Sequence, residues 1–410
     1  MRLLVLSDRM YGGQSAYSKH TFEVCTRLAA LGHKVAHIPM GYANQMGKQV
    51  YKNVLVYDSD QYDPFCEEIA IKDYIEFKAD MIITNKEPWV FRGLPYQAIN
   101  FVPIVPLDHA PANSEILRRL TYAFKIIAIS RFGQRELKKK GYESIYIPLG
   151  VRTDIYQPMN KAECKKAFYL DPEEFVVGIV AMNRSRKMIP QMLRGYKRFL
   201  ELNPNVKSHL MLWTNVLPTR PPADTSQGIA DVGVSLLPEI YELGLGDKVN
   251  WIKWDDIEKI GGLPDFDPAG QWDMVRLYGA MDCLLGCTGG EGAGLPYLEA
   301  AACGVPSVYT NYAAAPEYAG PCGIPVNAED YVILNTPGTR FYLADIDGIA
   351  EALTKIYNAD RTKLAKQARA FAEKMSWENI IKDYWVPFLK SCEDELYPRI
   401  MKGGISSWST

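Results

Sequence analysis

The chain has 410 residues, of which 48% are hydrophobic and 11% aromatic, which suits a folded protein of two or three domains. A formal net charge of −2 argues against a nucleic-acid-binding protein, because such proteins are usually basic. The eight cysteines are scattered without the paired spacing of a zinc site, which indicates buried thiols in a reducing compartment.

Membrane and export signals are also missing from the sequence pattern. No apolar run approaches the ~20 residues that span a bilayer. The apolar run Leu3–Leu6 is too short for a signal peptide and has the form of a buried strand. We therefore expect a cytoplasmic protein.

The first half of the chain alternates short apolar strands with helices. It begins with a strand at Leu3–Ser7, a helix at Ser15–Leu31 that Gly32 closes, and a strand at Lys34–Pro39. A further helix is predicted at Cys66–Phe77. Further strands are predicted at residues 53–57, 81–84, 101–105 and 126–130. Short, continuously apolar strands separated by helices predict a parallel, doubly wound sheet.

The second half repeats this pattern from about Pro172. A strand at Phe175–Met182 and a helix at Pro190–Glu201 come first. Further strands are predicted at residues 209–214, 249–254, 283–285 and 306–310. The long connection Pro218–Gly246 is interpreted as an insertion with a helix at Val232–Leu243.

The tail at Ser376–Ile400 is rich in aromatic residues. Its apolar positions recur at helical spacing and fit one buried face. They are Trp377, Ile380, Ile381, Tyr384, Trp385 and Phe388.

The stretch 289–304 (GGEGAGLPYLEAAACG) is the most informative of the chain. Its glycines leave backbone N–H groups unshielded just before a predicted helix at Leu295–Cys303, whose N-terminus is a ready anion site. Glu291 before the helix can bind sugar hydroxyls, and Glu299 within it can bind a ribose diol. A phosphate flanked by two polyols is a nucleotide-sugar.

Glu291 and Glu299 resemble the Glu-x7-Glu motif of family 4 glycosyltransferases (GT4), which have the two-domain GT-B fold. Met1–Gly13 resembles the first strand and glycine loop of that family, and Ile147–Pro158 resembles its inter-domain P-x-G-V-x-x-D-x-[FY]-x-P signature. Glu317 matches another recurrent acid. The resemblance implies two Rossmann-like doubly wound domains facing a central cleft.

The resemblance also implies the domain limits. We expect an acceptor domain over residues 1–168 and a nucleotide-sugar donor domain over residues 169–383. A C-terminal helix over residues 384–410 is expected to cross back onto the first domain.

Site residues follow from the same resemblance. His109, Lys187 and Glu291 are the expected catalytic residues. Donor-binding residues are expected at Gly13, Arg184, Arg186, Gly292, Ala293, Gly294, Leu295 and Glu299. The usual family arginine falls at Met182, so Arg184 or Arg186 would replace it, and a solvated basic loop stays open as the alternative for both. The nucleotide base is expected near Trp251–Trp254.

Other patterns carry weaker signals. The chain has three Asp-x-Asp triplets, at residues 58–60, 265–267 and 345–347, and we attribute them to chance, with no metal required. The basic segment Arg131–Lys140 is either an ordinary solvated helix face or a membrane-docking surface. A homodimer is kept open.

The sequence therefore predicts a retaining, metal-independent hexosyltransferase. GDP-mannose is the favoured donor by analogy, followed by UDP-glucose or UDP-GlcNAc, and the acceptor is an unidentified glycan or lipid-linked glycan. Two alternatives remain open: a nucleotide-sugar-binding protein without transferase activity, and a GT-B-fold nucleotide-sugar epimerase.

Overall fold

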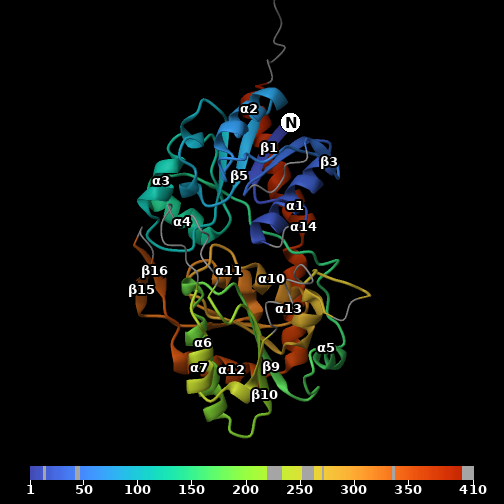
Figure 1. Cartoon of the computed structure of the whole chain (residues 1–410), viewed down its shortest axis with the longest axis vertical. Helices are drawn as coiled ribbons and strands as arrows, with labels where there is room; N and C mark the ends of the chain where they lie inside the picture. The colour runs from blue at the N-terminus through green and yellow to red at the C-terminus, as the bar shows by residue number, and fades with distance from the viewer. Residues whose placement is uncertain are drawn as a thin grey trace, which may run out of the picture.

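A computed structural model describes residues 1–12, 15–41, 47–218, 233–251, 263–269, 272–334 and 338–398. Figure 1 shows the two halves of the chain stacked along the long axis, the first half at the top. Each half contains its own sheet, with helices packed against it. A third, two-stranded sheet belongs to the second half.

The first sheet has eight strands in the order β3-β4-β2-β1-β5-β6-β7-β8. All pairs are parallel except the edge pair β3–β4. The strands are β1 (Arg2–Ser7), β2 (Lys34–Pro39), β3 (Gln49–Tyr51), β4 (Val54–Val56), β5 (Met81–Asn85), β6 (Phe101–Val105), β7 (Ile127–Ala128) and β8 (Ile145–Tyr146). Its central strands are almost wholly buried, as expected for a parallel sheet with helices on both faces.

Three helices of the first half begin at polar capping residues. Ser15, Asn113 and Ser130 each accept a backbone N–H in the first turn of the helix that follows. These helices are α1 (Ala16–Ala30), α3 (Ser114–Leu120) and α4 (Arg131–Lys139), and α2 (Glu67–Phe77) is the fourth.

The second sheet has six parallel strands in the order β11-β10-β9-β12-β13-β14. They are β9 (Phe175–Val180), β10 (Ser208–Trp213), β11 (Val249–Trp251), β12 (Cys283–Gly286), β13 (Ser307–Thr310) and β14 (Ile324–Val326). Strands β15 (Tyr331–Leu334) and β16 (Thr339–Tyr342) form an antiparallel hairpin.

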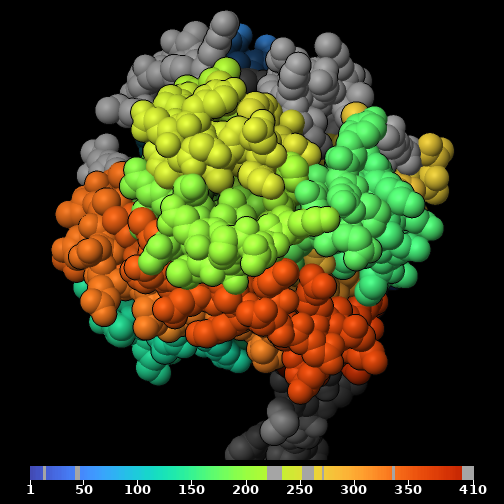
Figure 2. Space-filling view, turned by 90° about the horizontal axis from the view of Figure 1, so that it is seen from below, coloured from blue at the N-terminus to red at the C-terminus, as the bar shows by residue number. Residues whose placement is uncertain are grey.

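Eight described helices accompany these strands. They are α5 (Lys161–Ala167), α6 (Ile189–Leu202), α7 (Leu237–Glu242), α9 (Met274–Ala280), α10 (Leu295–Ala302), α11 (Ala315–Ala319), α12 (Ile346–Asn358) and α13 (Arg361–Lys374). Figure 2 looks onto the lower end of this half, where the region of α6 and α7 (green to yellow) and of α12 and α13 (orange-red) forms the surface.

The doubly wound prediction is confirmed for both halves, with two kinds of correction. Strand β9 ends at Val180 rather than Met182, and the helix expected at Val232–Leu243 is described from Leu237 to Glu242. Strands β3, β8 and β14 and the hairpin β15–β16 were not predicted. All of these strands are short, and β3 and the hairpin also pair antiparallel and follow no βα repeat.

The C-terminal segment returns from the second half to the first. It comprises α14 (Trp377–Ile380), a π-helical turn η6 (Ile381–Trp385) and α15 (Val386–Leu396), and so begins before the predicted limit at 384. Trp377 stacks on His20 of α1 with ring centroids 5.5 Å apart, and Lys125 pairs with Glu395 at 2.6 Å. The predicted apolar face is buried except at Tyr384, which is half-buried. The exact domain limits stay a prediction.

Within the described part of the chain, no helix has both the length and the apolar character needed to cross a bilayer.

Two buried histidines make the fold sensitive to acid. Burial lowers the pKa of His20 and of His37 to about 4. The unfolded chain, with histidine pKa values near ~6.5, therefore takes up protons that the folded chain excludes. The part of the folding free energy that depends on neutral histidines is fully present above about pH 6.5 and is lost as the pH falls toward 4.

We expect each histidine to lower the free energy of unfolding by about 1.4 kcal/mol per pH unit inside this window. Urea denaturation at pH 7, 6 and 5 measures the slope. The variant His37→Gln should have a shallower slope by that amount. If the free energy of unfolding changed with pH at the same rate in the wild type and in His37→Gln, the lowered pKa of His37 would not contribute to acid sensitivity.

Candidate functional site

A glycine-rich turn joins β12 to α10 and places Glu291 in the cleft. At Gly294 the backbone has a φ of 124°, and an added Cβ would lie 2.5 Å from the ring of Tyr297. Only glycine fits both the left-handed backbone and the close ring. The turn therefore leads directly into α10, whose N-terminus is the predicted anion site.

The same turn touches the loop that follows β6 in the first half. A Cβ at Gly290 would lie 2.2 Å from the carbonyl oxygen of Asp108, and one at Gly292 would lie 2.8 Å from that of Pro106. Glycine at both positions lets the two halves meet backbone to backbone. The turn and the loop after β6 are thus in close backbone contact at this point.

Four charged groups gather where the halves meet. Lys187 Nζ lies 2.5 Å from Glu291 Oε1, and Arg186 lies 3.3 Å from Glu291 Oε2. Arg186 Nε also faces Asp108 of the first half at 3.8 Å. We name Asp108, Arg186, Lys187 and Glu291 the charged cluster.

The electrostatics of the charged cluster keep its carboxylates ionised. Burial works to raise the pKa of Glu291, but Lys187 and Arg186 outweigh it and hold the pKa below its ordinary value. The pKa of Asp108 is also lowered: burial raises it, whereas His109 and Arg186 lower it by a larger amount. Burial lowers the pKa of Lys187 despite Glu291 beside it. Two cations and two carboxylates thus balance within a poorly solvated site.

His109 adjoins the charged cluster and is 5% exposed. Its Nδ1 lies 2.7 Å from Asp108 Oδ1 and its Nε2 lies 3.1 Å from the amide nitrogen of Asn113. Both contacts are satisfied when Nδ1–H donates to Asp108 and Nε2 accepts from the side-chain amide of Asn113. The ring is therefore fixed in orientation beside the cleft.

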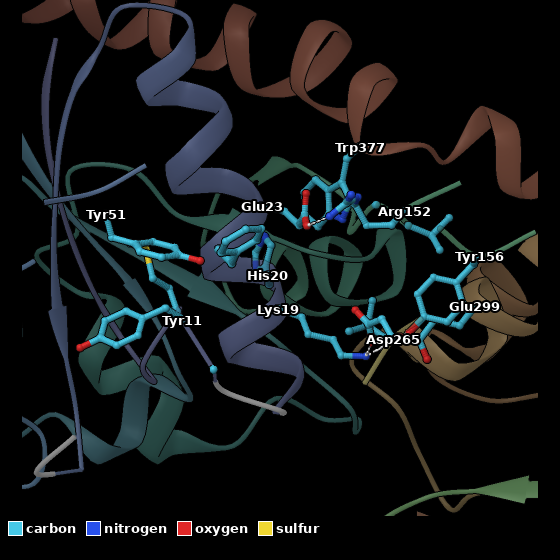
Figure 3. Close-up of a pocket in the computed structure, with 16 residues that line it drawn as sticks. Tyr11, Lys19, His20, Glu23, Tyr51, Arg152, Tyr156, Asp265, Glu299 and Trp377 are labelled. Atoms are coloured by element: carbon cyan, nitrogen blue, oxygen red, sulfur yellow. Dashed lines mark hydrogen bonds and ion pairs between the residues drawn. The ribbon is translucent and has the colours of Figure 1, made fainter. Parts of the chain in front are cut away.

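A second cluster surrounds Glu299 on α10. Lys19 of α1 donates to Glu299 Oε1 at 3.1 Å and to Tyr156 Oη at 3.2 Å, and pairs with Asp265 at 2.8 Å. Figure 3 shows Lys19 pointing from α1 toward Asp265 and Glu299. Tyr278 Oη donates to Glu299 Oε2 at 2.7 Å.

Burial works to lower the pKa of Lys19, but Glu299 and Asp265 outweigh it, so the pKa lies above its ordinary value. Lys19 is therefore charged at neutral pH. Each oxygen of Glu299 accepts one described hydrogen bond and keeps a free lone pair, which suits a vicinal diol.

A cavity of about 210 Å³ opens between the two halves beside this second cluster. Leu295 and Glu299 of α10 line it on one side and Gly12 on the other. Tyr11 and Tyr51 reach it from the first half (Figure 3). The predicted ribose carboxylate, Glu299, lies within α10 and lines this cavity, whereas the predicted sugar carboxylate, Glu291, lies in the turn before the helix and is not among the residues that line it.

The other predicted residues are placed as follows. Gly292 and Ala293 lie in the turn, and Ala293 is buried. Arg184 forms no ion pair with Glu291 or Asp108 of the charged cluster, and Met182 is 61% exposed. Gly13 and the expected base-binding residues beyond Trp251 lie outside the described residues. Of the two candidate arginines, Arg186 is the one in the cluster.

Sequence reasoning missed Lys19, Asp108 and Asp265 as site residues. Asp265 belongs to a triplet attributed to chance, yet it lines the cavity and contacts Lys19. No strand was predicted directly before Asp265, so no sequence pattern indicated it as a site residue. Asp108 precedes the predicted His109, and that adjacency was the one available hint.

The other two triplets have local structural contacts. Asp58 accepts the backbone N–H of Gly47, and Asp345 caps the first turn of α12. Among the described residues, no three His, Cys, Asp or Glu side chains gather in a group that could hold a metal ion.

Glu317 joins the two halves instead of facing the cavity. Its carboxylate oxygens accept the backbone N–H groups of Arg131 and Phe132, each at 2.7 Å. These amides open α4 of the first half, so a side chain of α11 caps a helix across the cleft.

The sequence is similar to curated glycosyltransferases over part of its length. A stretch of 237 residues is 27% identical to D-inositol 3-phosphate glycosyltransferase of Actinosynnema mirum, covering 57% of this chain and 48% of that protein. A stretch of 136 residues is 29% identical to O-antigen chain mannosyltransferase B of Escherichia coli, covering 33% of this chain and 29% of that protein. The chain spans about half the length of the first relative and less of the second. No family model matches it.

Solved structures resemble nearly the whole chain. Sucrose-phosphate synthase from Thermosynechococcus elongatus superposes with a TM-score of 0.70 at 17% identity, covering 95% of this chain and 98% of that chain. Anabaena HepE in complex with UDP and glucose gives a TM-score of 0.66 at 16% identity, covering 95% and 100%. At such identities the likeness establishes architecture, and the chain has the GT-B fold.

Proposed function

We propose that the protein is a retaining, metal-independent glycosyltransferase of family 4 that transfers a hexose from a nucleotide-sugar. The observation that carries the proposal is the arrangement of Glu291 and Glu299 around the N-terminus of α10, with Lys187 and Arg186 at the sugar end. Carboxylates at both ends can accept hydrogen bonds from hydroxyls, and the helix N-terminus between them, with the two cations at the sugar end, offers positive charge to a diphosphate. A nucleotide-sugar requires both. The similarity to curated glycosyltransferases supports it.

In the proposed reaction the bond between the anomeric carbon and the diphosphate oxygen breaks while the acceptor hydroxyl attacks from the same face. The leaving diphosphate takes the proton of that hydroxyl. Negative charge grows on the leaving oxygen, and Lys187 with Arg186 stabilises it. Glu291 and His109 orient the sugar, and Glu299 holds the ribose.

GDP-mannose is the proposed donor, with UDP-glucose and UDP-GlcNAc next. One relative is named a mannosyltransferase, which supports the first choice. A structural neighbour binds UDP and glucose, which keeps the second choice open.

The epimerase alternative requires a carboxylic acid and a carboxylate that exchange a proton near the sugar. Asp108 and Glu291 are the two carboxyl groups of the charged cluster, and both have lowered pKa values because cations and hydrogen-bond donors adjoin them. Two carboxylates that both stay ionised supply no proton at neutral pH, which favours transfer over epimerisation.

Calorimetric titration with GDP-, UDP- and ADP-sugars tests the proposal. We expect one class of nucleotide-sugar to bind and to be hydrolysed slowly to free sugar and nucleoside diphosphate. Binding without any hydrolysis or transfer would favour the binding-protein alternative. Failure of every nucleotide-sugar to bind would contradict both.

The two arginines give a matched pair of variants. Arg186→Ala removes a cation that contacts Glu291 and faces Asp108, so kcat should fall about 10²-fold. Arg184→Ala, outside the charged cluster, should change kcat much less. Steady-state donor hydrolysis measures both variants, and an effect of equal size at the two positions would contradict the assignment of Arg186.

A further inference from the structure

The hairpin β15–β16 has one face turned to solvent. Tyr331 pairs with Tyr342 and Ile333 with Arg340, so these residues share a face, while Phe341 points to the other. Exposure agrees with this alternation, since Tyr331 is 43% and Ile333 61% exposed and Phe341 is 3% exposed. The outer face thus presents two tyrosines, an isoleucine and an arginine.

The inner face fixes the hairpin to the glycine-rich turn. The N–H of Tyr342 donates to the carbonyl oxygen of Gly289 at 2.9 Å. A Cβ added at Gly289 would lie 2.8 Å from Phe341 Cβ. Since an isolated two-stranded hairpin is marginally stable, this contact determines its place beside the turn that bears Glu291.

An aromatic strip connects the hairpin with the charged cluster. It comprises Tyr331, Tyr342 and Tyr312, with ring centroids 5.7 Å and 4.3 Å apart in that order. At its inner end Tyr312 Oη accepts the N–H of Ala110, next to His109, at 2.8 Å. The strip therefore begins at the proposed sugar site and ends on exposed surface.

The strip lies on the side of the molecule away from the C-terminal crossing. In Figure 1 the hairpin is at the left edge, whereas α13 and α14 lie to the right. The hairpin end of the strip and the crossing helix are therefore on different sides of the molecule.

The chemistry of the strip fits a saccharide. A sugar ring has an apolar face of C–H groups that packs on an aromatic ring and an edge of hydroxyls that needs polar partners. Tyrosine supplies both, and Arg340, whose guanidinium lies 4.9 Å from the Tyr331 ring, adds hydrogen-bond donors at the outer end. An anionic lipid surface would call for several cations, and the outer face holds one.

We propose that the aromatic strip is a binding subsite for the acceptor, and that the acceptor is an oligosaccharide of at least two residues. The terminal residue lies at the charged cluster and the following residues stack along Tyr312, Tyr342 and Tyr331. This inference rests on the proposed function and adds the substrate class.

The test uses immobilised mono- to tetrasaccharides of glucose, mannose, galactose and N-acetylglucosamine, probed with the fluorescently labelled full chain in the presence of UDP or GDP. The variant Tyr331→Ala/Tyr342→Ala removes both rings, and Tyr331→Phe/Tyr342→Phe keeps them. Tyr241→Ala, at an exposed tyrosine of α7, is the control for loss of a surface ring. Calorimetry on the same preparations measures UDP and GDP binding and verifies the fold of each variant.

We expect the affinity of the wild-type chain to rise with saccharide length. The double alanine variant should lose roughly tenfold or more in affinity for tri- and tetrasaccharides, and the phenylalanine variant and the Tyr241 control should lose little.

Three results would overturn the inference. The first is equal saccharide affinity in the wild type and the double alanine variant, and the second is a wild-type affinity that does not rise with saccharide length. The third is a chain that binds nucleotide but no saccharide. Loss of binding to phosphatidylglycerol vesicles in the alanine variant, with saccharide binding unchanged, would assign the strip to a membrane instead. A wild-type chain that binds none of UDP, GDP and ADP in the calorimetry contradicts the proposed function, and the inference falls with it.

Discussion

Lys187→Met is expected to lower kcat for sugar transfer about 10²–10³-fold, because the lysine stabilises charge that develops on the leaving diphosphate. The variant should also lose stability. Lys187 and Glu291 are 15% and 10% exposed and lie 2.5 Å apart, so removing the lysine leaves a buried carboxylate with less compensation. Breaking such a pair typically costs about 3–5 kcal/mol. Steady-state kinetics and urea denaturation measure the two effects.

A second variant separates catalysis from folding. In Lys187→Met/Glu291→Gln both charges are gone and Arg186 still faces Asp108, so much of the lost stability should return. Activity should stay low, since both the cation and the carboxylate that orients the sugar are absent. Recovery of activity together with stability would mean that Lys187 acts through the fold and not on the reaction.

Gly290→Ala is expected to lower kcat/KM for transfer about 10²-fold or more, while the nucleotide still binds. The added methyl group would lie 2.2 Å from the carbonyl oxygen of Asp108, so the two halves cannot approach as closely as they do here. Glu291 and Lys187 would then lie farther from His109, and these three groups must be aligned on the same sugar for the reaction to proceed. Small-angle scattering with UDP or GDP bound should give a larger radius of gyration for the variant.

Gly93→Ala is the matched control for this prediction. A Cβ there meets its nearest atom, Glu67 Oε2, at 3.7 Å, an ordinary contact. Its kinetics should remain near wild type. If Gly290→Ala were equally active, the contact between the turn and Asp108 would have no part in catalysis.

The sequence allowed prediction of those parts of the fold that depend on local pattern. Short apolar strands followed by capped helices, such as β1 with α1, recur along the chain and give the doubly wound sheets. The glycine-rich turn and Glu291 were predicted as a site because their residue types and spacing, all within a few residues, are typical of an anion site beside a sugar-binding acid. The antiparallel hairpin β15–β16 has no such repeat and was missed.

Contacts between the two halves could not be predicted from the sequence, because they join residues far apart in the chain and no pattern of neighbouring residues indicates them. Lys19 is an ordinary helix lysine by sequence, and its contact with Glu299 joins residues far apart in the chain. Arg184 and Arg186 could not be separated, since only the fold directs Arg186 toward Glu291 and Asp108. Asp265 could be recognised as a candidate site residue only from the structure, in which it lines the cavity and pairs with Lys19.

Because Glu317 caps α4 from the other half, separation of the two halves can be detected at the backbone amides that it binds. If the halves separate, the amides of Arg131 and Phe132 lose their carboxylate partner and become open to solvent. Their hydrogen–deuterium exchange would then follow the fraction of time that the cleft spends open. A ligand that holds the halves together would slow that exchange without touching either residue.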